Sequence, residues 1–278
     1  MSHLEALSEI RSLGFRSDFL VLAGESMAEV HPDRIVLRTP DQPDFWWGNL
    51  VLFRDGQVDP VTQPEQFRAD FPQAAHVLVA WDDPAMTVGP GHSALAEAGY
   101  EVESMDVLTL SGNLVATPPP ENVDIRPIET DADWEKVIAL QCETGLEEGF
   151  ERASYEAFLR QRFASRRCQI AEGWGRWFGA FDGDLLVGDL GIFVAAGIAR
   201  YQRVETRASH RRRGICAALV TEGVNWARSR DPNAVPVIVA LSDGPAGRVY
   251  RRCGFAWAES QVAATLQPKG AKVSGSSD

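Results

Sequence analysis

The sequence predicts an α/β protein built from two domains, and three observations lead to this expectation. Short apolar and β-branched runs alternate with amphipathic helical segments along the whole chain. A length of 278 residues suits one large domain or two medium ones. The charge is unevenly spread, because residues 1–120 hold 18 acidic and 6 basic residues, whereas residues 121–278 hold 21 of each. This asymmetry favours two domains.

A proline run lies where the charge changes. Thr117–Pro120 reads TPPP, which is typical of a stiff linker. We therefore expect one domain over residues 1–116, a linker over 117–121 and a second domain over 122–267. The last residues, 268–278, are rich in Gly and Ser, which predicts a disordered tail.

The composition excludes several classes of protein. The chain has 45% hydrophobic and 24% charged residues, close to the globular average, and no apolar run approaches the roughly 20 residues that span a bilayer. Its start carries carboxylates among the apolar residues, unlike a signal peptide. The cysteines form no C-x-x-C pair, which indicates reduced thiols in a cytoplasmic protein, and the histidines form no H-x-x-x-H, so we expect no metal site. The net charge of -12 disfavours a nucleic-acid partner, and we expect no membrane partner.

In the first domain the apolar periodicity predicts helices and strands in mixed order. The expected helices are Leu4–Leu13, Pro64–Phe71 and Ser93–Ala98, the last closed by Gly99. The expected strands are Phe19–Leu22, Ile35–Leu37, Phe45–Phe53, His76–Trp81 and Val102–Leu110.

In the second domain the same criteria predict a strand, two helices, three strands and then alternating helices and strands. The expected helices are Asp131–Cys142, Ser154–Ala164, Ile215–Arg228 and one through Tyr250 that ends at Gly254. The expected strands are Val123–Ile128, Trp177–Phe181, Leu186–Val194, Arg200–Thr206, Val235–Leu241 and a last one within Phe255–Leu266.

The segment from Val204 to Val220 is the strongest chemical signal. A strand stops, a loop with several arginines and Gly214 follows, and a helix begins at once. The unsatisfied N–H groups of a helix start attract an anion, a glycine allows close approach, and arginines add charged hydrogen bonds. The segment therefore predicts a phosphate site, although a solvated basic turn that caps an ordinary helix explains the loop equally well. The sequence lacks the G-x-x-x-x-G-K-[ST] of a nucleotide-binding P-loop.

Two motifs resemble the GCN5-related N-acetyltransferases (GNAT). The acetyl-CoA motif of that family, V-x-V-x-P-x-x-[RQ]-x-x-G-x-[GA], is matched by Val204, Thr206, Arg211, Gly214 and Cys216, with Ala208 in place of the proline. The second motif, A-x-x-[L/V]-Y-x-x-x-G-F, is matched by residues 246–255, which contain Tyr250. The resemblance covers about residues 122–266 and implies a mixed, mostly antiparallel sheet flanked by helices, with a splayed acetyl-CoA cleft.

The resemblance also implies roles for individual residues. Backbone groups of Val204 and Thr206 would pair with the pantetheine arm, and the Thr206 amide would stabilise a developing oxyanion. Amides from Arg212 to Ala217 would hold the pyrophosphate, with charge from Arg211 and its neighbours. The implied donor-binding residues are Val204, Glu205, Thr206, Arg211, Arg212, Arg213, Gly214, Ile215, Cys216 and Ala217. Tyr250 would be the catalytic acid that protonates the departing CoA thiolate, or else a tyrosine that packs beside Phe255.

The acceptor side is less defined by the sequence. Glu205 neighbours the acceptor strand, but in one interpretation its side chain simply faces solvent. The position where many relatives carry a carboxylate holds Arg200, which cannot act as a base. Glu147 and Glu148, expected in a loop, could attract a cationic amine or simply be solvated. We assign no general base. Neither the amine acceptor nor the oligomeric state follows from these motifs.

Cys216 supports a different hypothesis. A thiol at a helix start beside arginines is expected to have a lowered pKa and hence a reactive thiolate, as in a redox protein. The family motif places a small residue at this position, so packing is the alternative reason for Cys216.

The first domain resembles a second, degenerate copy of the same fold. Gly99 and Tyr100 follow a helix as Gly254 and Phe255 do, and Leu95 stands where the catalytic tyrosine would be. No arginine–glycine loop occurs between Phe53 and His76. An unrelated α/β domain is the alternative. Trp46 and Trp47 are candidates for an acceptor pocket, or for ordinary core packing.

The function that we predict is acetyl-CoA-dependent N-acetyl transfer, direct from the thioester to an amine of a small molecule or peptide, by the second domain. A non-catalytic acyl-CoA-binding regulatory module is the alternative, and a redox protein that uses Cys216 is a third hypothesis.

Overall fold

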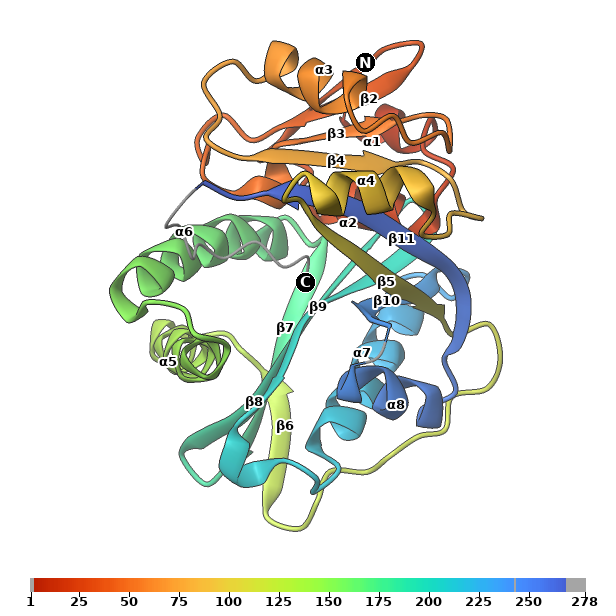
Figure 1. Cartoon of the computed structure of the whole chain (residues 1–278). Helices are drawn as coiled ribbons and strands as arrows, with labels where there is room; N and C mark the ends of the chain where they lie inside the picture. Colours follow the sequence, from red (N-terminus) through yellow and green to blue (C-terminus); the bar gives the residue numbers. More distant parts are fainter. Residues whose placement is uncertain (1–2, 243, 269–278) are drawn as a thin grey trace.

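The computed structural model describes residues 3–242 and 244–268. Their strands form one mixed sheet of 11 strands in the order β1-β2-β3-β4-β11-β5-β10-β9-β8-β7-β6, with helices on both faces (Figure 1). Both halves of the chain contribute to this sheet. Most of the predicted tail, 269–278, lies outside the described residues. None of the helices described here has the length and apolar character needed to cross a membrane.

The first half mixes helices and strands, as the sequence periodicity predicts. Its helices are α1 (His3–Leu7), α2 (Leu13–Val21), η1 (Trp46–Gly48, a 3-10 turn), α3 (Thr62–Asp70) and α4 (Pro90–Glu97). Its strands are β1 (Met27–Val30), β2 (Arg34–Arg38), β3 (Leu50–Phe53), β4 (Val77–Trp81) and β5 (Glu101–Thr109).

The second half follows the predicted order of elements. Its helices are α5 (Asp131–Glu148), α6 (Arg152–Ala171), η2 (Ala208–His210), α7 (Ile215–Arg230) and α8 (Pro245–Arg252). Its strands are β6 (Val123–Pro127), β7 (Gly175–Asp182), β8 (Leu185–Ala195), β9 (Ile198–Thr206), β10 (Val235–Leu241) and β11 (Ala256–Leu266).

Several predicted elements were wrong in type or length. Phe19–Leu22 is not a strand, because α2 begins after Ser12, whose hydroxyl accepts a hydrogen bond from the Phe15 amide and caps the helix. The expected strand Phe45–Phe53 begins as the 3-10 turn η1, and only Leu50–Phe53 is extended. Helix α5 continues to Glu148, six residues beyond the predicted end at Cys142.

The last strands of the two halves are exchanged. Strand β5 of the first half pairs antiparallel with β10 of the second, and β11 of the second half pairs antiparallel with β4 of the first. The two exchanged strands also pair with each other, from Ala256 opposite Thr109 to Thr265 opposite Glu101. Each half thus completes the sheet of the other, which is why the boundaries at 116 and 122 remain predictions.

The helices that precede these strands have matching ends. Both α4 and α8 begin with a proline after a glycine, at Pro90 and Pro245, where the missing proline N–H costs no helical hydrogen bond. Both are followed by a glycine with positive φ, +92° at Gly99 and +102° at Gly254, a conformation that suits glycine. This correspondence supports the interpretation that the first half is a repeat of the second.

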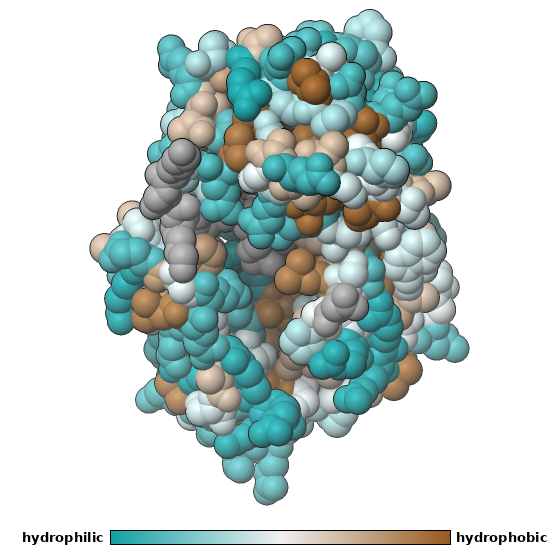
Figure 2. All heavy atoms as spheres, in the orientation of Figure 1, coloured by the Kyte–Doolittle hydropathy of each residue, from teal (hydrophilic) through white to brown (hydrophobic). Residues whose placement is uncertain are grey.

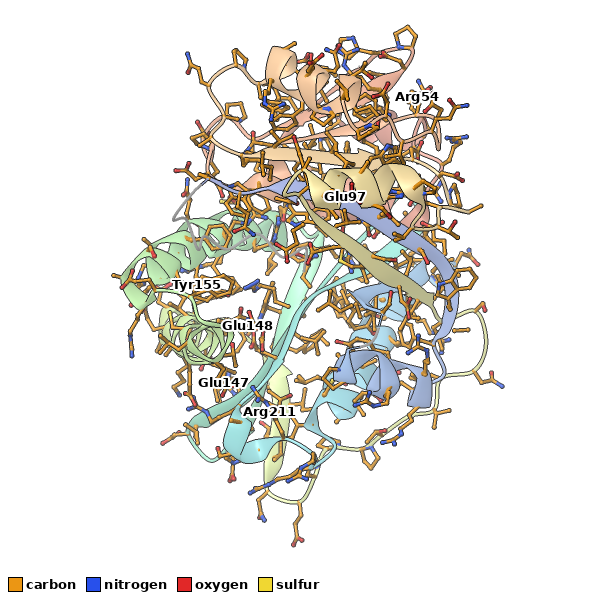
Figure 3. All side chains as sticks on the ribbon, viewed as in Figure 1. Arg54, Glu97, Glu147, Glu148, Tyr155 and Arg211 are labelled. Atoms are coloured by element: carbon orange, nitrogen blue, oxygen red, sulfur yellow. The ribbon has the colours of Figure 1, made fainter. Side chains whose placement is uncertain are left out.

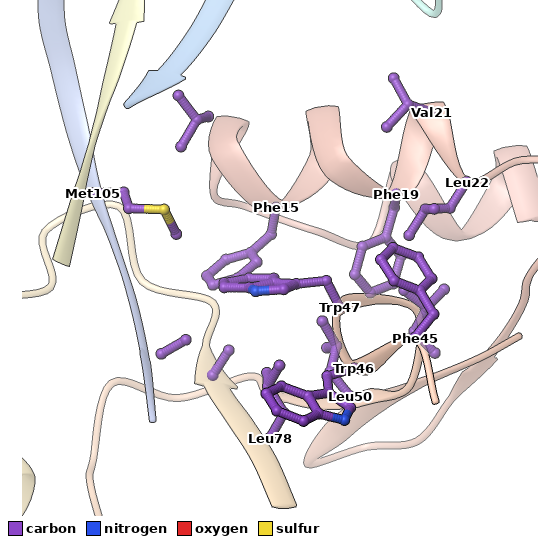
Figure 4. Close-up of a cluster of buried hydrophobic side chains, with 14 of the residues drawn as sticks. Phe15, Phe19, Val21, Leu22, Phe45, Trp46, Trp47, Leu50, Leu78 and Met105 are labelled. Atoms are coloured by element: carbon purple, nitrogen blue, oxygen red, sulfur yellow. The ribbon is translucent and has the colours of Figure 1, made fainter. Parts of the chain in front are cut away.

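One cluster of buried hydrophobic residues continues through both halves. Figure 4 shows Phe15 and Phe19 of α2 packed near Trp46 and Trp47, and both tryptophans are 5% exposed. The tryptophans are therefore core residues and do not line an acceptor pocket. A second cluster lies under α7 and α8 on the opposite face of the second half and contains Tyr201 and Tyr250.

Candidate active site

The parallel strands β9 and β10 separate part-way along their length. They pair only from Ile198 opposite Val235 to Arg200 opposite Val237. Strand β9 continues to Thr206 with β8 as its remaining neighbour, and β10 continues to Leu241 beside β5. The two strands therefore leave an open edge between them. Figure 2 shows this face of the molecule hollowed between α5 and α8, with hydrophobic residues among those that line it.

The open edge of β9 presents backbone groups. The Arg207 amide donates to the Val187 carbonyl at 2.9 Å, and the Glu205 carbonyl lies against Gly188, so the backbone groups of both residues point to β8. Because these groups alternate in direction along a strand, those of Thr206 point to the open edge. A bulge precedes this segment, where Arg203 has a φ of +46°.

Helix α7 begins directly beyond this edge. Gly214 is its N-cap, with a φ of +87°, and the Ala218 amide donates to the Gly214 carbonyl at 3.0 Å. Three amides precede that first helical hydrogen bond, those of Ile215, Cys216 and Ala217. Because they have no acceptor within the helix, they are the N–H groups that suit an anion. The buried Ile215 side chain anchors the turn in the cluster under α7, while Arg212 and Arg213 are exposed.

Arg211 connects the loop to the acceptor side. Its Nε donates to the Thr206 carbonyl at 3.0 Å, and its Nη2 lies 2.6 Å from Glu147 Oε2 (Figure 3). Glu147 and Glu148 were predicted in a loop, which is wrong, because both lie in the last turn of α5. The carboxylate of Glu147 is thus held by the motif arginine.

The predicted reactivity of Cys216 is wrong. Burial, with smaller contributions from the nearby Cys253 and Glu205, raises the pKa of its thiol to about 12. The thiol therefore stays protonated at neutral pH, and the helix start does not offset the loss of solvent.

Tyr250 lies on α8, close to the diverging strands. Its side chain is 5% exposed and belongs to the same buried cluster as Ile215 and Tyr201. The next residue, Arg251, forms an ion pair with Asp106 of β5. A strand of the first half thus contacts the helix that carries Tyr250.

A buried polar network lies on the α5 side of β8 and β9. Asp189 Oδ2 accepts hydrogen bonds from Trp177 Nε1 at 2.8 Å and from Gln141 Nε2 at 2.9 Å. Gln141 Oε1 accepts from Arg203 Nε at 2.7 Å, and Arg203 also donates to the Tyr155 hydroxyl. Sequence reasoning missed this network. An aspartate inside the apolar run LLVGDLGIFV was the available signal.

Glu205 stands directly opposite Asp189 in the β8–β9 ladder. Two carboxylates thus share a face, because paired residues in antiparallel strands point to the same side. Burial raises the pKa of Asp189 to about 7. Arg200 is 1% exposed and donates to Asp18 of α2 at 2.8 Å, so it holds the first half against β9. Among residues 3–242 and 244–268, no cluster of three or more His, Cys, Asp or Glu could hold a metal ion.

Comparison with known proteins agrees with this geometry. Residues 135–255 match the model of the acetyltransferase (GNAT) family. This part of the chain is a GNAT domain. It contains the open edge of β9, the start of α7 and Tyr250. The family uses acetyl-CoA as its cosubstrate. No curated protein matches the chain in sequence.

Solved structures match over nearly the whole chain. A GCN5-related N-acetyltransferase from Kribbella flavida has a TM-score of 0.62 at 18% identity, covering 94% of this chain and 98% of its own. A functionally unknown conserved protein from Staphylococcus epidermidis has a TM-score of 0.65 at 11% identity, covering 86% and 93%. A tandem GNAT protein from the clavulanic acid biosynthesis pathway has a TM-score of 0.53 at 13% identity, covering 98% and 96%. These likenesses show the fold, including its tandem plan.

The first half lacks the open edge of the GNAT domain. Strands β3 and β4 stay paired up to their last residues, Phe53 opposite Trp81. Trp81 is completely buried, whereas Leu241 at the end of β10 is 58% exposed. At the start of α3, the Asp59 carboxylate accepts from the amides of Val61 and Thr62, both at 2.9 Å. The helix start that would bind a phosphate is thus capped by a carboxylate of the chain itself.

Proposed function

We propose that the protein is an acetyl-CoA-dependent N-acetyltransferase that transfers the acetyl group directly to an amine of a small molecule or peptide. The observation that carries this proposal is the separation of β9 from β10 directly before the start of α7. That arrangement offers backbone partners for the pantetheine arm and helix-start amides for the pyrophosphate of one donor molecule.

The donor is bound in three parts. The backbone of Val204 and Thr206 pairs with the pantetheine amides, and the amides from Arg212 to Ala217 hold the pyrophosphate. Arg211 adds charge once a phosphate competes with Glu147 for its guanidinium. The support for this assignment is that the open edge of β9 leads into the N-cap Gly214.

The transfer itself needs no acyl-enzyme. The acceptor amine attacks the thioester carbonyl, the Thr206 amide stabilises the developing oxyanion, and the CoA thiolate leaves. Tyr250 donates its hydroxyl proton to that thiolate, while the proton that the amine loses passes to solvent, from which Tyr250 is protonated again. Burial of Tyr250 in the cluster that also holds Ile215 supports this role, because it places the tyrosine on the same side of the sheet as the donor-binding turn.

The acceptor enters from the α5 side of β9. Carboxylates on this side include Glu147, Glu148 and Glu205, and they favour an amine that arrives as a cation. Tyr155 stacks on Phe150 with ring centroids 4.6 Å apart, which gives this side an apolar wall. We therefore expect acceptors that combine an amine with an apolar or aromatic body.

Calorimetric titration of acetyl-CoA tests the proposal first. One site per chain is expected, because Asp59 caps α3 and β3 remains paired with β4 in the first half. Thiol release with a panel of amines then tests transfer. Donor binding without transfer to any amine would favour the regulatory module, and two sites per chain would contradict the assignment of an inactive first half. Absence of binding would refute the proposal.

A further inference from the structure

The segment that joins the two halves is attached to the GNAT domain. Three backbone amides hold it: Leu110 donates to the Pro236 carbonyl at 3.1 Å, Val115 to the Cys253 carbonyl at 2.9 Å, and Thr117 to Thr221 Oγ1 at 3.0 Å. Residues 113–117, which we call the linker strap, thus pass from the end of α8 to α7. A proline-rich spacer alone would not need these bonds.

The linker strap lies against the glycine of each donor motif. A Cβ on Gly254 would lie 2.7 Å from the Asn113 carbonyl oxygen, and a Cβ on Gly214 would lie 3.9 Å from Thr117 Cγ2. Gly214 is the N-cap of the helix that we assign to the donor pyrophosphate. Thr117, which is half-buried, therefore lies within van der Waals reach of the donor-binding turn.

The charges around this turn differ between its two sides. On the α5 side, Arg211 pairs with Glu147 and Arg207 pairs with Glu143, so carboxylates stand there. The strap side has no charged residue from Ser111 to Pro120. The pantetheine arm of an acyl-CoA occupies the β9 edge, so its phosphorylated nucleotide leaves the turn on another side. On the α5 side these carboxylates already hold the arginines, so a 3′-phosphate placed there would have to displace them.

We propose that Thr117 of the linker strap contacts the nucleotide half of the acyl-CoA donor and so contributes to donor specificity. This inference rests on the proposed function. The linker strap would then bind part of the donor as well as join the two halves of the chain. The chemical class recognised is a phosphorylated adenosine attached to the pyrophosphate.

Charge substitutions at Thr117 test the inference, since its backbone amide, which bonds Thr221, is unchanged by them. T117K is expected to bind acetyl-CoA about tenfold more tightly than T117E, because the introduced charges act on the 3′-phosphate. S-acetyl-4′-phosphopantetheine, which lacks the nucleotide, is expected to bind the two variants within about twofold of each other. The difference for acetyl-CoA is expected to shrink as salt is raised.

Val61 provides the matched control. It is an exposed N-cap residue of α3 in the first half, so V61K and V61E make the same change of net charge away from the donor turn. Equal affinity of T117K and T117E for acetyl-CoA would overturn the inference. So would an equal effect on both donors, which would place the contact at the 4′-phosphate that the two donors share, or an equal effect of the Val61 pair. If the wild type binds neither donor, the proposed function itself has failed.

Discussion

Asp106 of β5 and Arg251 of α8 form an ion pair that connects the first half of the chain to the helix carrying Tyr250. Asp106 lies in the middle of an exchanged strand, opposite Ala240 of β10 and Ser260 of β11. The first half, although it lacks an open strand edge of its own, therefore supplies a residue that holds α8 of the second half in place.

The ion pair predicts that D106N impairs the enzyme through the position of α8. We expect kcat to fall about three- to tenfold, because a small displacement of a reacting group is costly, while the Kd for acetyl-CoA stays nearly constant. Steady-state kinetics and calorimetry measure the two quantities. The control is E135Q, which removes the partner of an exposed pair with Arg160. An unchanged kcat for D106N would show that α8 is held without this contact.

Tyr250 is predicted to be the acid in the transfer step. Y250F is expected to lower kcat about 10²-fold at neutral pH with little change in acetyl-CoA affinity, since only proton donation is lost. The matched control is Y100F, which removes a hydroxyl that accepts from Arg68 in the first half. Equal rates for Y250F and the wild type would remove Tyr250 from the mechanism.

Asp189 is predicted to make stability depend on pH. Burial raises its pKa in the folded state to about 7, above the unfolded value of about 3.9, so the folded protein binds the proton more tightly. This contribution is fully present below about pH 4 and is lost as the pH rises through about 7. D189N has no carboxyl group to titrate at this position. Its free energy of unfolding should therefore fall less than that of the wild type between about pH 4 and 7.

Urea unfolding of wild type and D189N at pH 5 and pH 8 measures this effect. The variant should gain stability relative to the wild type at pH 8 by on the order of a few kcal/mol, and by about a third of that at pH 5. An equal difference at both pH values would mean that Asp189 remains ionised in the folded protein.

Glu25 is predicted to be essential for the contact between the halves. Its carboxylate lies 2.8 Å from Arg162 and 3.1 Å from Arg166, both on α6, and all three side chains are buried. Burial alone would raise the pKa of Glu25, but the two arginines outweigh it and hold that pKa below its ordinary value. E25Q is expected to lower the free energy of unfolding by about 3–5 kcal/mol, because two buried guanidinium groups lose their counter-ion.

Urea unfolding compares E25Q with E135Q. The exposed Glu135–Arg160 pair is expected to contribute less than about 1 kcal/mol to the free energy of unfolding. If E25Q lowers the free energy of unfolding as little as E135Q does, solvent or nearby carbonyl groups stabilise the two arginines in place of Glu25.

The helix start and the helix end that carry the two family motifs could be predicted from the sequence because they depend on local backbone features. Gly214 and Gly254 mark a helix start and a helix end at fixed distances from a strand, and both adopt the positive φ that suits glycine. The buried polar network beside α5 could not be predicted in this way. Gln141, Tyr155 and Asp189 come from three elements, and nothing in their spacing shows that they share one network.

The sequence by itself determined the α/β class, the order of most elements, the two donor motifs and their separation, because periodicity and glycine positions act within a few residues. The tertiary structure alone decided the exchange of β5 and β11, since pairing between distant strands depends on the whole chain. It also decided the environment of side chains. Cys216 stands beside arginines in the sequence, yet burial keeps its thiol protonated, because desolvation depends on everything packed around a group.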